Sequence, residues 1–114
     1  MLKELSKIMT EQEFRDLADH ALEDLHRRLS AANLECEADF SGGALVIEFD
    51  DTPAKFVVSP NAPVKQVWVS ANLKSHKLDW DPARNTFALP AGGMSLADLI
   101  ADAIAQQIGR TVRF

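Results

Sequence analysis

The sequence predicts an α+β protein in which two helices pack on one face of a five- to six-stranded antiparallel sheet. Two segments, residues 11–30 and 95–108, repeat apolar side chains at helical spacing and lie at opposite ends of the chain. Between them, residues 34–89 divide into short alternating or apolar runs that are separated by turn residues. Helices with one apolar stripe each can cover one sheet face, so we expect a two-layer sandwich.

The composition indicates one domain with its own core. The chain has 114 residues, of which 46% are hydrophobic. We expect a domain over residues 10–114, preceded by an N-terminal extension at residues 1–9. The one cysteine, Cys36, forms no intrachain disulfide, which fits a reducing compartment. No apolar run reaches the ~18 residues of a membrane span, and residues 1–9 make a poor signal peptide. We therefore expect a cytoplasmic protein, or a mitochondrial matrix protein if a targeting segment was removed.

The charge is distributed unevenly along the chain. Residues 1–51 hold 13 acidic and 5 basic residues, whereas residues 52–114 hold 4 acidic and 7 basic residues. An acidic half of this kind favours cations or a basic partner. It argues against nucleic acid, because binding to phosphates requires a clustered basic surface.

The first predicted helix, residues 11–30, begins with a capping box formed by Thr10 and Glu13. Its apolar stripe consists of Phe14, Leu17, Ala18, Ala21, Leu22, Leu25 and Leu29. At ~100° per residue, Asp16, Asp19 and Glu23 lie on the opposite, solvent-facing side. This helix therefore exposes a mostly carboxylate face.

The first two predicted strands form a hairpin. Residues 34–40 alternate strictly, with Leu34, Cys36, Ala38 and Phe40 facing the core and Glu35, Glu37 and Asp39 facing solvent. Ser41-Gly42-Gly43 is a hairpin turn, and residues 44–49 are the return strand. A third strand covers residues 55–59, and the segment 60–63 is expected to be a loop.

The strand at residues 63–70 carries the most informative pattern. Val67 and Val69 face the core, while Gln66, Trp68 and Ser70 face the other side. A strand tryptophan is more often a core residue than a binding residue, but the polar neighbours of Trp68 favour an exposed position. Lys65 and Lys77 are expected near it. A polar loop at residues 71–76 and short strands at residues 77–80 and 86–89 follow.

The second predicted helix, residues 95–108, again begins with a cap, formed by Ser95 and Asp98, and ends before Gly109. The tail that follows is expected to place Val112 and Phe114 in the seam between helices and sheet.

The acidic residues are the strongest chemical signal. Asp16, Asp19 and Glu23 are neighbours along the first helix, and three more acids follow the next strand. Oxygen ligands favour hard cations such as Ca²⁺, Mg²⁺ or Mn²⁺ and also accept Fe²⁺ weakly. We predict weak, exchangeable binding; the alternative is an ordinary solvated surface. We assign no catalytic residue: Cys36 is expected to be a core residue, and His20, His26 and His76 are expected to be solvated.

The chain resembles the frataxin family, called CyaY-type proteins in bacteria. The most specific segment is Asn61-Ala62-Pro63-Val64-Lys65-Gln66-Val67-Trp68-Val69-Ser70, and the resemblance extends over residues 11–114. It implies weak iron binding and a role as a regulator or iron donor in iron–sulfur cluster assembly. The implied partners are a cysteine desulfurase and its scaffold protein. The implied iron-binding acids are Glu11, Glu13, Asp16, Asp19, Glu23, Glu35, Glu37 and Asp39, and the implied partner-binding residues are Lys65, Gln66, Trp68 and Lys77.

Two alternatives remain open from the sequence. One is a ferroxidase that oxidises Fe²⁺ to Fe³⁺, although a dinuclear His and Glu site of the helical-bundle type is not visible. The other is a protein-interaction domain without a physiological metal. We expect a monomer, with metal-dependent oligomers as an alternative, and no binding to membranes.

Overall fold

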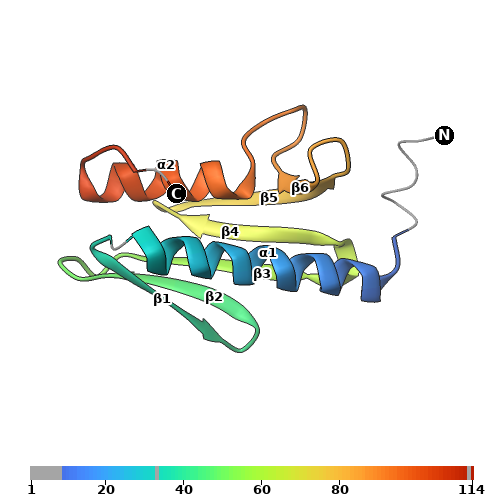
Figure 1. The fold of residues 1–114 in the computed structure, drawn as a ribbon, viewed down its shortest axis with the longest axis horizontal. Helices are drawn as coiled ribbons and strands as arrows, with labels where there is room; N and C mark the ends of the chain where they lie inside the picture. Colours follow the sequence, from blue (N-terminus) through green and yellow to red (C-terminus); the bar gives the residue numbers. More distant parts are fainter. Residues whose placement is uncertain (1–8, 33, 113) are drawn as a thin grey trace.

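Two helices cover one face of a six-stranded antiparallel sheet (Figure 1). The structure, a computed structural model, describes residues 9–32, 34–112 and 114. The strands follow one another in the order β1-β2-β3-β4-β5-β6, so the sheet is a meander without crossovers. The elements are α1 (Glu11–Ala32), β1 (Cys36–Ser41), β2 (Ala44–Phe49), β3 (Lys55–Asn61), η2 (Ala62–Val64), β4 (Gln66–Ala71), β5 (Lys74–Asp81), β6 (Thr86–Ala88) and α2 (Leu96–Ile108). The predicted fold class is confirmed; residues 1–8 of the predicted extension lie outside the described part.

Both helices begin where their N-terminal caps predict, and α2 also ends at its predicted C-cap. The Thr10 hydroxyl accepts the Glu13 N–H at 3.0 Å, and the Glu13 carboxylate accepts the Thr10 N–H at 2.9 Å. At α2, the Ser95 hydroxyl accepts the Asp98 N–H at 3.2 Å. Gly109 ends α2 with a φ of 76°, which glycine adopts without steric cost. The α1 helix continues to Ala32, two residues beyond the predicted end.

The β1–β2 hairpin closes through Gly42 and Gly43, whose φ angles are 59° and 87°. Both values lie in the left-handed region that a two-residue hairpin turn requires. Ser41 pairs with Ala44, and the register that follows places Glu37 directly opposite Glu48. The turn thus determines which side chains of β1 and β2 meet.

The predicted polar loop at residues 71–76 is wrong. Ala71 pairs with Lys74, and Asn72 and Leu73 form a two-residue turn with φ angles of 51° and 65°. Asn72 is a common turn residue, but leucine is not typical of the second turn position, where hairpins usually have glycine. The Asn72 side-chain amide donates to the Ala103 carbonyl of α2 at 3.2 Å, which ties the turn to the helix layer. The β5 strand is therefore eight residues long instead of four.

The end of β3 and the start of β4 also differ from the predicted boundaries. The β3 strand continues through Pro60 to Asn61, which had been assigned to a loop. Residues 62–64 form the 3-10 turn η2, so β4 begins at Gln66 and not at residue 63. The predicted four-residue loop is thus replaced by the last two residues of β3 and the first two of η2.

The core lies between the sheet and the helices, and Phe87 is near its centre. The Phe87 ring packs edge-on against Phe14 of α1, with centroids 5.8 Å apart, and against Trp80 of β5, at 5.1 Å. Val112 is buried in the same core, and Phe114 is half-buried against it. These two positions agree with the predicted role of the tail.

Phe40 contradicts the sequence prediction, which placed it in the core. Its side chain is 49% exposed because β1 is the terminal strand of the sheet. The Phe40 ring lies against His26 of α1, with ring centroids 5.3 Å apart. His26 is therefore half-buried in an aromatic contact and not simply solvated. Within the described residues, neither helix is long and apolar enough to cross a membrane.

Candidate metal and partner-binding surfaces

The predicted metal-binding acids at the start of α1 are engaged within the helix. The Glu13 carboxylate is part of the cap described above. The Glu11 carboxylate lies 3.6 Å from the Arg15 guanidinium, and the Asp16 carboxylate accepts the Gln12 side-chain amide at 2.9 Å. Each carboxylate is exposed, so these contacts are weak and a cation could displace them at little cost.

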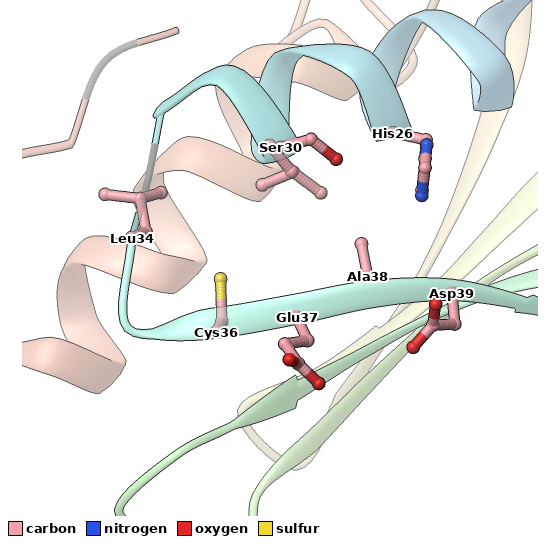
Figure 2. Close-up of a pocket in the computed structure, with 8 residues that line it drawn as sticks. His26, Ser30, Leu34, Cys36, Glu37, Ala38 and Asp39 are labelled. Carbon is pink, nitrogen blue, oxygen red and sulfur yellow. The ribbon is translucent and has the colours of Figure 1, made fainter.

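Asp19 and Glu23 lie further along α1, on the same side of the helix as Asp16. They precede His26 by seven and three positions, so the three side chains share one flank of the helix. His26 of this flank points toward β1 (Figure 2). Asp19 and Glu23 are exposed, and within the described residues neither makes a side-chain hydrogen bond or ion pair. They are the part of the α1 acidic face with carboxylates free to meet a ligand.

The β1 acids divide into one engaged residue and two free ones. Glu35 precedes β1 and is ion-paired with Arg110, whose guanidinium donates a hydrogen bond to it. That hydrogen bond lowers the pKa of the Glu35 carboxyl from its ordinary value of 4.5, despite an opposing effect of partial desolvation. Glu37 and Asp39 are exposed and point away from α1 (Figure 2). The predicted set of three strand acids is therefore not one cluster.

Glu48 is an acid that the sequence interpretation missed. It lies directly opposite Glu37 on the open face of the sheet, and its own carboxylate is 4.0 Å from the Lys55 ammonium. Like charges in directly opposite positions repel. The glycine turn and the strand alternation would have placed these two glutamates together from the sequence alone.

The free acids and Glu48 do not converge on one point. Asp19 and Glu23 lie on the helix layer, whereas Glu37, Asp39 and Glu48 lie on the open sheet face. Within residues 9–32, 34–112 and 114, no three His, Cys, Asp or Glu side chains are placed so that they could hold a metal ion together. The carboxylate pairs suit a hard divalent cation that keeps most of its water.

Trp68 lies on the open face of the sheet and is 37% exposed, as the alternation predicts. Its indole N–H donates to the Gln66 side-chain oxygen at 3.1 Å, and the Gln66 amide donates to Asp79 at 3.1 Å. The Lys77 ammonium lies over the indole ring, 5.0 Å from its centroid. Asp79, to which the sequence assigned no role, thus holds the residue that orients the indole.

A groove of about 270 Å³ extends from Trp68 across the middle of the open face. Ser59, Trp68 and Lys77 form one cross-strand row, and Val57, Ser70 and Ser75 form the next. Small side chains beside a large aromatic ring leave a shallow recess with an apolar wall. Such a surface fits a protein partner better than a small ligand.

Lys65 differs from the other predicted partner-binding residues. It ends the η2 turn in the left-handed region, with a φ of 54°, and its N–H donates to the Ala62 carbonyl at 3.1 Å. Its side chain is half-buried, and the residue lies directly before β4, the strand that carries Trp68. The structure thus brings together Gln66, Trp68 and Lys77, while Lys65 has a turn-forming position next to them.

A second cavity, of about 320 Å³, lies between the C-terminal half of α1 and β1 (Figure 2). Cys36 and Ala38 point from β1 toward the helix, and His26 and Ser30 line the opposite wall. Burial, together with the negative charges of Asp50 and Glu35, raises the pKa of the Cys36 thiol. The thiol is therefore protonated at neutral pH and a poor nucleophile.

Comparison with known proteins shows that the chain matches one family over most of its length. The profile of the Frataxin-like domain family matches residues 7–110. The chain is 26% identical over 106 residues to the iron-sulfur cluster assembly protein CyaY of Azotobacter vinelandii, covering 93% of this chain and 96% of that protein. The CyaY protein of Pseudomonas aeruginosa is likewise 26% identical, with 93% and 97% covered.

A solved structure shows the same fold. The frataxin from Psychromonas ingrahamii aligns with a TM-score of 0.81 at 23% identity, covering 91% of this chain and 96% of that chain. At this identity the likeness shows the fold alone.

Proposed function

Because the chain belongs to the frataxin-like domain family, we propose that it acts in iron–sulfur cluster assembly. In this proposal the protein binds Fe²⁺ weakly and docks on the complex of cysteine desulfurase and scaffold protein. There it regulates the rate of cluster assembly or donates iron. The relatives named above are iron-sulfur cluster assembly proteins and match nearly end to end. The observation that carries the docking proposal is the exposed and oriented Trp68.

Trp68 has the properties of an interface anchor. A large aromatic side chain on the surface leaves apolar area in water, which a partner can remove. The hydrogen bond to Gln66 and the Lys77 ammonium restrict the indole before a partner arrives. A side chain that is already oriented loses less conformational entropy on binding. The adjacent groove provides the recess into which a partner side chain would fit.

The iron proposal rests on four exposed carboxylates, of which that of Glu48 lies 4.0 Å from the Lys55 ammonium. Asp19 and Glu23 on α1, and Glu37 and Glu48 on the open sheet face, are two pairs that would supply oxygen ligands to Fe²⁺. A bound cation would also relieve the repulsion between Glu37 and Glu48. Two carboxylates without further protein ligands leave the ion largely hydrated, so binding is weak and exchangeable. No observation favours a ferroxidase centre, and we do not propose one.

Docking is tested with Trp68→Ala and the purified desulfurase–scaffold complex. The affinity should fall at least tenfold, since truncated aromatic anchors cost about 2 kcal/mol or more. Trp68→Phe should retain part of the affinity, and His20→Ala on the exposed side of α1 is the control that should change nothing. Unchanged binding by Trp68→Ala contradicts the docking proposal.

Iron binding is tested separately by anaerobic titration of the ¹⁵N-labelled protein with Fe²⁺. Signals of Asp19, Glu23, Glu37 and Glu48 should broaden first, whereas those of Asp98 and Asp102 on α2 should persist as internal controls. The variant with Glu37→Gln and Glu48→Gln should lose the response on the sheet and keep the response on α1. If millimolar iron affects all acids equally or none, the iron proposal is wrong and the docking proposal stands by itself.

A further inference from the structure

Leu73, at the tip of the β4–β5 hairpin, is the most exposed large apolar side chain in the described part of the chain. Its φ is 65°, in the left-handed region. Leucine is strained there because its Cβ approaches the following carbonyl oxygen, a contact that glycine does not make. The fully exposed side chain thus weakens the turn and contributes no packing in return. Strain of this kind is concentrated where proteins bind or react.

The hairpin tip has a fixed position beside α2 (Figure 1). The side-chain amide of Asn72, the first residue of the turn, donates to the Ala103 carbonyl of α2 at 3.2 Å. Ala71, directly before the turn, is buried and pairs with Lys74. Leu73 therefore extends from an anchored turn, and little backbone freedom is lost when a partner covers its side chain.

Leu73 and Trp68 belong to the same hairpin and lie within reach of one partner. Trp68 precedes Ala71, the last residue of β4, by three positions. At ~3.3 Å per residue, about 10 Å of strand separates Trp68 from the start of the turn. A stable protein interface covers about 800 Å² on each partner, which is enough to include both side chains. A protein that covers Trp68 can therefore also contact Leu73.

The segment around Leu73 is basic, unlike the chain as a whole. Residues 60–78 contain Lys65, Lys74 and Lys77 and no acidic residue, although the net charge of the chain is −5. Lys74 follows Leu73 directly, is exposed, and forms no ion pair within the described residues. The leucine favours an apolar pocket on the partner, and the adjacent ammonium favours carboxylates at the rim of that pocket.

We infer that Leu73 inserts into an apolar pocket with an acidic rim on the same protein that covers Trp68, and so acts as a second anchor of the docking surface. This inference rests on the docking proposal above and adds the chemistry of the partner's surface. A membrane is a less suitable occupant, because one leucine and a few lysines bind lipid weakly and the net charge of −5 opposes an anionic surface.

The test compares Leu73→Gly with wild type by thermal unfolding and by affinity for the purified desulfurase–scaffold complex. The glycine variant should melt about 2–5 °C higher, because the strain at this φ is removed. Its affinity should fall about tenfold, since the interface loses a buried leucine side chain. A residue that only shapes the turn would not give a variant that is more stable and yet binds more weakly.

Three further variants identify what the partner recognises. Leu73→Met keeps a long apolar side chain and should bind within about threefold of wild type. Met94→Gln removes another exposed apolar side chain and should leave the affinity unchanged. Lys74→Gln should weaken binding about twofold to threefold at low salt, whereas Arg15→Gln, with the same change of net charge, should not weaken it.

Wild-type affinity in Leu73→Gly, or an equal loss in Met94→Gln, would overturn the inference; a tenfold loss in Trp68→Ala in the same assay would then leave the proposed docking intact. Unchanged affinity in Trp68→Ala would refute the proposed docking and this inference together. A lower melting temperature of Leu73→Gly would show that Leu73 packs in the fold, contrary to the inference. Leucine-dependent binding to vesicles of anionic lipid would assign Leu73 to a membrane and also overturn it.

Discussion

The two tryptophans lie on neighbouring strands but face opposite sides of the sheet. Trp80 of β5 is half-buried under the helices and packs edge-on against Phe87, 5.1 Å away. Trp68 of β4 is on the open face, where its contacts are a hydrogen bond to Gln66 and the Lys77 ammonium. The first is surrounded by apolar core residues and the second by polar groups that orient it.

This difference shows how the same residue type serves stability on one face and recognition on the other. Burial against apolar side chains contributes to folding whether or not a partner exists. An exposed indole contributes little to folding, and its apolar area becomes useful only when a partner covers it. The alternation of a strand, which turns each side chain to one face or the other, decides between the two roles.

The largest expected effect separates the two tryptophans by stability. Trp80→Ala should lower the free energy of unfolding by about 3 kcal/mol, because it leaves a cavity beside Phe87. Trp68→Ala should lower it by less than about 1 kcal/mol. Urea unfolding followed by circular dichroism measures both variants. Equal losses would show that Trp68 is part of the core and weaken its assignment as a binding residue.

A smaller effect tests whether Gln66 orients Trp68. Gln66→Ala removes the acceptor of the indole N–H and should reduce stability by about 1 kcal/mol or less. The indole proton resonance should move upfield, and its exchange with water should accelerate. Gln66→Glu keeps an acceptor and should preserve the resonance. An unchanged indole signal in Gln66→Ala would mean that the indole is held by Lys77 alone.

A still smaller effect on stability is expected where Glu37 and Glu48 lie opposite each other on the open face. Glu37→Gln should raise the free energy of unfolding by about 0.3 kcal/mol at low salt, since it removes repulsion with Glu48. The gain should disappear at 1 M salt, where the Debye length is about 3 Å. Glu48→Gln should gain less, because it also loses Lys55. A loss of stability in Glu37→Gln would show that the two glutamates are not in repulsion.

The smallest effect is a pH dependence at Glu35. The pKa of this carboxyl is lowered by the hydrogen bond from Arg110, so the charged form is favoured in the folded state. The stabilisation is present above the ordinary value of 4.5 and is lost as the pH falls through the lowered folded pKa. Glu35→Gln should therefore be slightly less stable than wild type at neutral pH and equal to it in acid. Arg110→Gln should show the same dependence of stability on pH. A stability difference from wild type that persists in strong acid would exclude the charged Glu35 carboxylate as its cause.

The fold was predictable because its signals are local. Two caps, two apolar stripes and the Gly42-Gly43 turn specify the helices and the first hairpin within a few residues each. The β4–β5 turn was missed because Leu73, its second residue, adopts a left-handed conformation that leucine does not favour. Phe40 was misplaced because alternation identifies a face of the sheet and does not reveal where the helix layer ends.

The candidate site was predictable in its residues more than in its arrangement. The outward position of Trp68 follows from alternation, but its contacts with Gln66 and Lys77 depend on cross-strand register and side-chain conformation. The acids were identified one by one, yet sequence spacing does not show that Glu35 meets Arg110, which is 75 positions away. Nor did it show that the free acids are divided between the helix layer and the open sheet face.

The turn at Asn72 and Leu73 also has a kinetic consequence. Leu73 is fully exposed with a φ of 65°, a conformation that costs a side-chain-bearing residue roughly 1–2 kcal/mol. The turn between β4 and β5 thus depends on the packing of its strands, whereas the Gly42-Gly43 turn favours hairpin closure locally. We therefore expect the N-terminal hairpin to form early, on the ~1–10 μs scale of isolated hairpins. The β4–β5 hairpin, which presents Trp68, would become ordered only when the helices close over the sheet.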